Sequence, residues 1–67
     1  MSVAKVSEIS ATSAVGFQDA IEQGIARAHK TLRNVRSAWI KEQQVRVEQG
    51  SITEYQVNMM VTFVIDD

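Results

Sequence analysis

Apolar and polar side chains alternate along the last third of the chain. From Tyr55 to Ile65 the odd-numbered positions are apolar, while Glu54, Gln56, Asn58 and Thr62 are polar. A period of two is typical of a β-strand with one face in the core. The pattern therefore predicts a strand whose core face consists of the odd-numbered positions: Tyr55, Val57, Met59, Val61, Phe63 and Ile65.

A different period runs from Ala14 to about Val35, where apolar residues recur at steps of three and four positions. This spacing predicts an amphipathic helix. Ser13 or Thr12 is the expected N-cap. Gly24 costs about 1 kcal/mol relative to alanine in a helix, which is understandable if helix and sheet approach closely there. The predicted apolar stripe comprises Phe17, Ile21, Gly24, Ile25, Ala28, Leu32 and Val35.

The segment from Val3 to Ala11 is short and rich in β-branched residues, and Ala11-Thr12-Ser13 then provides a helix-start signal. It predicts a first strand. Strand alternation places Ser7, Ile9 and Ala11 on one face and Val6, Glu8 and Ser10 on the other.

Gln49-Gly50-Ser51 predicts the turn of a β-hairpin that joins the last two strands. Residues whose numbers sum to about 100 should then face each other. Opposite charges would meet on the outer face, where they support the pairing. The expected pairs are Val45 with Tyr55, Gln44 with Gln56, and Arg46 with Glu54.

If side chains alternated without interruption along the strand that precedes the hairpin turn, Trp39 would face the core and Ile40 would face outward. A β-bulge near Gln43 reverses this arrangement: it turns Ile40 inward and Trp39 outward, beside Met60. We therefore expect such a bulge.

The predicted fold is α+β with the order β-α-β-β. A right-handed crossover makes the first two strands parallel, so the third can lie between them, antiparallel to both. One amphipathic helix covers one face of this three-stranded sheet. The other face would present Val6, Trp39, Met60 and Val64. Exposed apolar area costs about 25 cal/mol per Å², so we expect another subunit or a flat ligand to cover Trp39.

Composition narrows the functional classes. The chain has 67 residues, no cysteine, a net charge of −1 and a pI near 5.7. Residues 1–67 are expected to form one domain, and a domain this small is often stabilised by oligomerisation. The charge argues against a nucleic-acid binder, and no apolar run is long enough to span a membrane. Without a signal peptide, a soluble cytoplasmic protein is expected.

The sequence offers no nucleophile–base pair, glycine-rich phosphate loop or paired carboxylates, so we expect neither catalysis nor a metal site. His29 is expected to be an ordinary residue on the flank of the helix. Arg27, Lys30, Arg33 and Arg36 recur toward the predicted helix C-terminus, where they would complement the helix dipole. The alternative is a patch that collects phosphate groups.

The spacing of several motifs over nearly the whole chain resembles the dodecin family. The first part of this resemblance comprises Ala11-Thr12-Ser13, Ala26-Arg27-Ala28 and Lys30-Thr31-Leu32-Arg33. The second comprises Trp39, Glu54-Tyr55-Gln56-Val57, Val61 and Phe63.

The resemblance implies a hollow homododecamer that binds flavin, with flavin pairs stacked between the tryptophans of two subunits. Because electron-rich indole can return an excited flavin to its ground state by electron transfer, we expect storage and photoprotection of the flavin. The resemblance also implies that Trp39 is this tryptophan and that Gln56 binds the isoalloxazine edge. Arg46 would lie near a flavin or coenzyme A phosphate. Bacterial relatives imply FMN, with riboflavin, FAD and coenzyme A as further candidates. Val64 stands where such relatives often have arginine, which argues against coenzyme A more than against flavin.

These residue types suit flavin chemistry. Indole stacks on a flat, electron-poor ring, and a carboxamide offers two donors and an acceptor to its edge. Arginine binds phosphate through its planar fork. The expected binding residues are Trp39, Gln44, Arg46 and Gln56, all on one sheet face. Two alternatives stay open: a coenzyme A or nucleotide carrier, and a purely structural homo-oligomer.

Overall fold

The computed structural model describes residues 3–65. Strand β1 (Val3–Ser13) leads into helix α1 (Phe17–Thr31), which is followed by strands β2 (Val35–Glu48) and β3 (Ser51–Ile65). The strand order is β1-β3-β2, with β3 antiparallel to both neighbours. The predicted α+β fold with its β-α-β-β order is confirmed.

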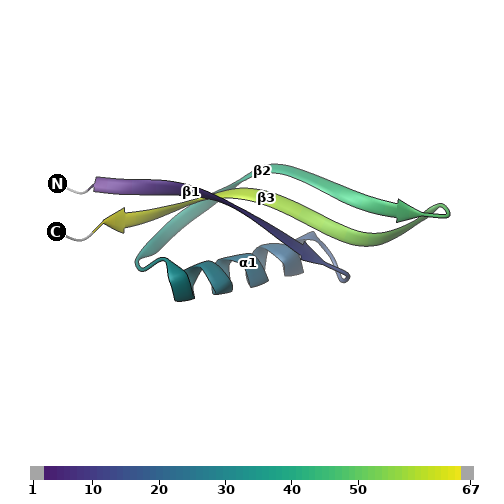
Figure 1. The fold of residues 1–67 in the computed structure, drawn as a ribbon, viewed down its shortest axis with the longest axis horizontal. Helices are drawn as coiled ribbons and strands as arrows, with labels where there is room; N and C mark the ends of the chain where they lie inside the picture. Colours follow the sequence, from purple (N-terminus) through teal and green to yellow (C-terminus); the bar gives the residue numbers. More distant parts are fainter. Residues whose placement is uncertain (1–2, 66–67) are drawn as a thin grey trace.

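The helix covers one face of the sheet, and the β2–β3 hairpin extends beyond it (Figure 1). The principal extents are 51 × 19 × 13 Å, and the radius of gyration is 13.8 Å. A compact domain of this length would have a radius of gyration of about 11 Å. The single chain is therefore elongated, and much of its sheet lies beyond the reach of its helix.

The core forms where α1 packs on the inner face of β1 and β3. Val57, Met59 and Val61 are fully buried, as their alternation predicted, and Ala20 joins them from the helix. Ala20 was absent from the predicted stripe, although it lies four positions, about one turn, before the buried Gly24 on the same face of the helix. Ile65, at the end of β3, is 44% exposed.

Gly24 is buried where the helix crosses the sheet. A Cβ atom built on Gly24 would overlap Met59 Cε and lie 3.1 Å from Ala11 Cβ. Only glycine fits this position without displacing its neighbours. The expected close approach of helix and sheet is thus confirmed.

Both predicted helix ends were wrong. The helix begins after Gly16, which has no side-chain cap, and Val35 belongs to β2 rather than to the helix. Ser13 is the last residue of β1. Its Oγ accepts hydrogen bonds from the backbone N–H groups of Val15 (2.9 Å) and Gly16 (3.4 Å). It donates one to Asp19 Oδ2 at 2.6 Å, so it holds the strand–helix turn instead of capping the helix.

The helix ends earlier because Leu32, directly after it, already has an extended backbone, with φ of −107° and ψ of 114°. Two residues later, Asn34 adopts a left-handed conformation, with φ of 62°. The chain reverses there into β2, and the Asn34 carbonyl oxygen accepts a hydrogen bond from Val64 N–H at 3.1 Å. Arg33 and Arg36 therefore lie outside the helix, in the connection and in β2. Their predicted place at the helix C-terminus was wrong.

The hairpin follows the predicted register. Val45, Gln44 and Arg46 face Tyr55, Gln56 and Glu54 respectively. The turn has positive φ at Gln49 (51°) and Gly50 (81°), as a type I′ hairpin requires. Ser51, predicted as part of the turn, already belongs to β3.

The predicted bulge in β2 lies between Ile40 and Glu42, two residues before Gln43. It gives Trp39 the outward position opposite Met60 and places Ile40 opposite the buried Met59. Ile40 is nevertheless 38% exposed, because α1 packs mainly under β1 and β3. A second irregularity near Val35 and a third near Val47 were not predicted.

Candidate functional site

The four predicted binding residues lie on the sheet face opposite α1, which we call the outer face. Trp39, Gln44 and Arg46 come from β2, and Gln56 comes from β3. Gln44 lies directly opposite Gln56, and Arg46 occupies the next outward position along β2. The sheet thus arranges the four side chains along one face in the order Trp39, Gln44 with Gln56, and Arg46.

The Trp39 side chain is the main apolar feature of this face. Its residue is 52% exposed, and its cross-strand neighbour is Met60. The bulge at Lys41 turns it outward, because one extra residue reverses the facing of the strand that precedes it. Lys41 Nζ lies 3.2 Å from Glu8 Oε1 on β1, so this ion pair crosses the sheet near the Trp39–Met60 pair.

Gln56 is half-buried and held by two hydrogen bonds. Its Nε2 donates to Ser10 Oγ at 3.0 Å and to Asn58 Oδ1 at 3.3 Å. A carboxamide nitrogen carries two N–H donors, and these bonds use both. The expectation that Gln56 offers both donors and acceptor to a ligand therefore needs correction: in this arrangement it offers its carbonyl oxygen.

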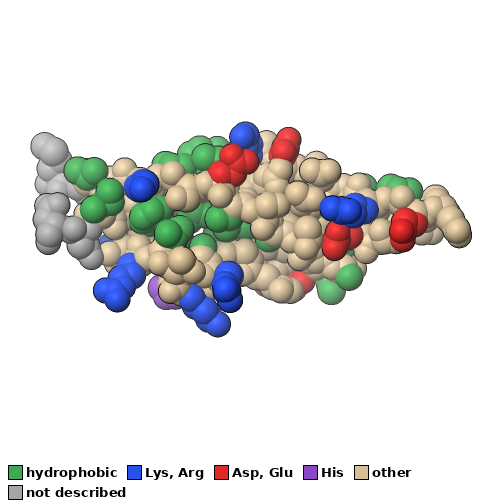
Figure 2. Space-filling model, in the orientation of Figure 1, with side chains coloured by type: hydrophobic (Ala, Val, Ile, Leu, Met, Phe, Trp, Pro, Cys, Tyr) green, Lys and Arg blue, Asp and Glu red, His purple; other side chains and the backbone are tan. Residues whose placement is uncertain are grey.

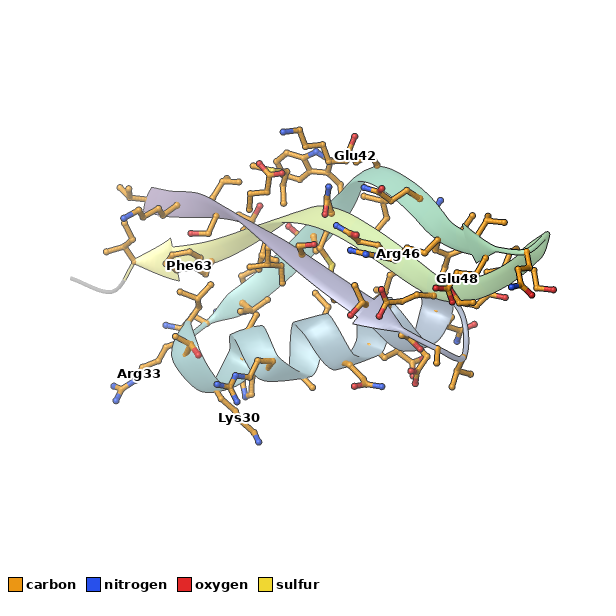
Figure 3. The ribbon with its side chains drawn as sticks, turned by 45° about the vertical axis from the view of Figure 1, so that its right-hand side comes forward. Lys30, Arg33, Glu42, Arg46, Glu48 and Phe63 are labelled. Carbon is orange, nitrogen blue, oxygen red and sulfur yellow. The ribbon has the colours of Figure 1, made fainter. Side chains whose placement is uncertain are left out.

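Asn58 continues the polar network toward β2. Its Nδ2 donates to Glu42 Oε1 at 2.5 Å, and the two residues are cross-strand partners. Figure 3 shows Glu42 projecting from β2 away from the helix. The sequence analysis did not single out Glu42 and Asn58, which belong to the hydrogen-bond network of Gln56. The hairpin pairing rule could have identified this pair, because the residue numbers 42 and 58 also sum to 100.

Arg46 forms the predicted ion pair with Glu54, with Nε 3.0 Å from Oε1. The two side chains are 68% and 38% exposed. The guanidinium is therefore reachable from solvent, and it already has a carboxylate partner. Gln44 is exposed beside it.

The outer face measures about 13 Å along β3 from the Trp39–Met60 row to Gln56, and about 20 Å to Glu54, at roughly 3.3 Å per strand residue. A single ligand that contacts both Trp39 and Gln56 must therefore extend along the sheet. A ligand that also reaches Arg46 needs an anionic tail.

Basic side chains gather over the helical side of the molecule (Figure 2). Lys30 and Arg33 project away from the sheet near the helix C-terminus (Figure 3). Lys30 lies in the last turn, together with the exposed His29, which suits the helix dipole. Within residues 3–65, no group of three or more His, Cys, Asp or Glu side chains could hold a metal ion.

Comparison with known proteins identifies the family. The Dodecin family model matches residues 3–66. The chain belongs to the dodecin family. Dodecin from Thermus thermophilus is 35% identical over 65 residues, which cover 97% of this chain and 94% of that one. The predicted resemblance is confirmed.

Solved dodecin structures share the fold. Dodecin from Streptomyces davaonensis superposes with a TM-score of 0.94 at 35% identity, covering 98% of this chain and 97% of that one. A calcium-chelating dodecin from Mycobacterium tuberculosis superposes with a TM-score of 0.82 at 29% identity, covering 96% and 91%. In the described part of the chain, no helix is long and apolar enough to cross a membrane.

Proposed function

We propose that this dodecin binds FMN on its outer face, with the isoalloxazine ring stacked on Trp39. The observation that carries the proposal is the exposure of Trp39, 52%, on a face that the chain's own helix leaves uncovered. Stacking would remove apolar area from water and add about 1 kcal/mol of favourable aromatic contact. Gln56 lies along the same face and would bind the ring edge. Gln44, opposite it, would contact the same ligand.

Arg46 would bind the FMN phosphate. It lies on the same face beyond Gln56, at a spacing that suits a phosphate on a ribityl tail. Its ion pair with Glu54 supplies a competing carboxylate, so FMN should be preferred over uncharged flavins only moderately. Riboflavin and FAD should bind through the same ring contacts.

The assembly we propose is a homododecamer in which flavin pairs lie between the Trp39 side chains of two subunits. Two features of the single chain support oligomerisation. The outer face exposes apolar side chains, and a groove of about 530 Å³ lies between β1 and α1, lined in part by Ile9, Ala11 and Ala28. Stacked indole would quench excited flavin by electron transfer, which suits storage and photoprotection. We propose no catalytic activity, and we place the protein in the cytoplasm.

A purely structural homo-oligomer is the second candidate. The same exposed Trp39, together with Val6 on β1, which is 42% exposed on the outer face, could pack against another subunit without a cofactor. A coenzyme A carrier is less favoured, because Val64 supplies no positive charge where bacterial relatives often have arginine.

Size-exclusion chromatography with in-line absorbance tests the proposal, using purified protein with and without added FMN. Flavin bands that co-elute with an assembly far above 7.5 kDa, with quenched flavin fluorescence, are expected. A large colourless assembly that leaves added FMN fluorescent would support the structural candidate instead.

A further inference from the structure

The amide of Gln56 has a fixed polarity that its surroundings determine. A carboxylate can only accept hydrogen bonds, so Glu42 requires the Nδ2 side of Asn58, and the distance between them is 2.5 Å. The Asn58 Oδ1 is thereby turned toward the next outward side chain of β3. There it accepts a hydrogen bond from Gln56 Nε2 at 3.3 Å.

We infer that the Glu42–Asn58–Gln56 chain, which we call the amide relay, makes the site selective for a ligand edge that presents an N–H donor. Each amide in the relay donates through its nitrogen toward Glu42 and leaves its carbonyl oxygen on the far side. The last group of the relay is therefore an acceptor, the Gln56 carbonyl oxygen. This inference rests on the proposed function, in which Gln56 meets the ring edge. The matching chemical class is a cyclic imide, whose N–H lies between two carbonyl groups, as at N3 of a flavin.

Ser10 is compatible with this orientation of the Gln56 amide but does not determine it. Its Oγ accepts from Gln56 Nε2 at 3.0 Å, but a hydroxyl can also donate, so it would tolerate either orientation of the amide. Glu42 alone in this cluster has no donor. It acts as a positioning residue, since the described contacts connect it to Gln56 through Asn58.

Reversing the relay provides the test. In Glu42→Lys the new ammonium can only donate, so it should bind Asn58 Oδ1 and turn Asn58 Nδ2 toward Gln56. The Gln56 carbonyl oxygen then accepts a hydrogen bond from Asn58 Nδ2, and Gln56 Nε2 faces the ligand. Two donors, Gln56 Nε2 and the imide N–H, would then oppose each other. Glu42→Lys/Asn58→Asp should restore the original polarity, because the carboxylate introduced by the second substitution accepts both from the new ammonium and from Gln56 Nε2.

The probes are lumiflavin and 3-methyllumiflavin, which lack a phosphate and differ only at the imide nitrogen. One hydrogen bond corresponds to a change of about 3- to 10-fold in affinity. We expect the preference for lumiflavin to fall by this factor in Glu42→Lys and to return in the double variant. Glu48→Lys makes the same charge change on β2 near the hairpin turn (Figure 3) and should leave the preference unaltered.

Ligand-free protein gives a separate readout. Nuclear Overhauser effects between the Gln56 side-chain amide protons and the Ser10 Hβ protons should be present in the parent and the double variant, and absent in Glu42→Lys. If the parent binds lumiflavin but Glu42→Lys keeps both the preference and these signals, the relay is wrong while flavin binding stands. If the parent binds neither flavin, the proposed function is wrong, and the ligand-free signals still decide whether Glu42 sets the amide.

Discussion

Arg46 and Glu54 face each other across the β2–β3 hairpin, with Nε and Oε1 3.0 Å apart. The pair lies on the outer face, in the row next to Gln44 and Gln56. An exposed pair contributes little to stability, about 0.2–1 kcal/mol. Its main consequence is that Glu54 competes for the guanidinium that we assign to phosphate.

Because of this competition, substitutions should be able to lower or to raise the affinity for FMN relative to riboflavin. Arg46→Ala should weaken FMN binding about 3- to 10-fold with little effect on riboflavin, because only FMN carries the phosphate. Glu54→Gln should strengthen FMN binding, since it removes the competing carboxylate. Fluorescence titration with both flavins, at low and high salt, checks the prediction. Equal losses for FMN and riboflavin in Arg46→Ala would place Arg46 outside the phosphate site.

Trp39→Ala should raise the dissociation constant for FMN about 10- to 100-fold, through lost area and lost stacking. Trp39→Phe should have a smaller effect, since a smaller ring remains. Val47→Ala is the matched control, because Val47 is also exposed, at 58%, on the same strand. Titration measures the affinity, and size-exclusion chromatography should show that the assembly persists. Dissociation of the assembly in Trp39→Ala would favour the structural candidate.

Ser13→Ala should destabilise the protein by about 1–2 kcal/mol. The substitution removes the donor to Asp19 and the acceptor for two backbone N–H groups at a buried site. Thr12→Ala is the neighbouring control, and its exposed side chain should matter far less. Urea denaturation at one fixed protein concentration gives the comparison. Equal costs at both positions would contradict the assigned role of Ser13.

Gly24→Ala reverses the usual effect of replacing a helical glycine. Alanine normally stabilises a helix interior by about 1 kcal/mol relative to glycine. Here the new methyl group would overlap Met59 Cε and crowd Ala11, so a net loss of about 1–2 kcal/mol is expected from overpacking. Met59→Leu removes the overlapping atom, and it should recover part of the loss in the double variant. The same urea measurement applies, and a stabilised Gly24→Ala protein would refute the close approach.

Much of the sheet could be predicted because side-chain alternation and hairpin pairing are local in sequence. Val57, Met59 and Val61 are buried as their period indicated, and the β2 bulge was inferred from the facing of Trp39 and Ile40. The helix ends could not be predicted in the same way. They depend on the extended backbone of Leu32 and on the hydrogen bonds of the Ser13 hydroxyl, neither of which the hydrophobic pattern records.

The four predicted site residues share a face because strand parity and register place them there. The polarity of the Gln56 amide was not predictable, since it depends on β1 as well as β2. The register of β1, which brings Ser10 opposite Asn58, follows from the crossover and not from a hairpin turn. Pairing rules therefore located Gln56 without showing which of its atoms is available.

The elongated shape of the chain has a consequence for how it matures. Its fully buried core is small, and the hairpin projects beyond the helix (Figure 1). In a single newly synthesised chain, few other parts of the same chain would pack against that hairpin and hold it in place. In the proposed assembly other subunits would hold the hairpin in place, so we expect the stability of the fold to fall when the protein is diluted. The abundance of the protein in the cell would then set the fraction that reaches its native form.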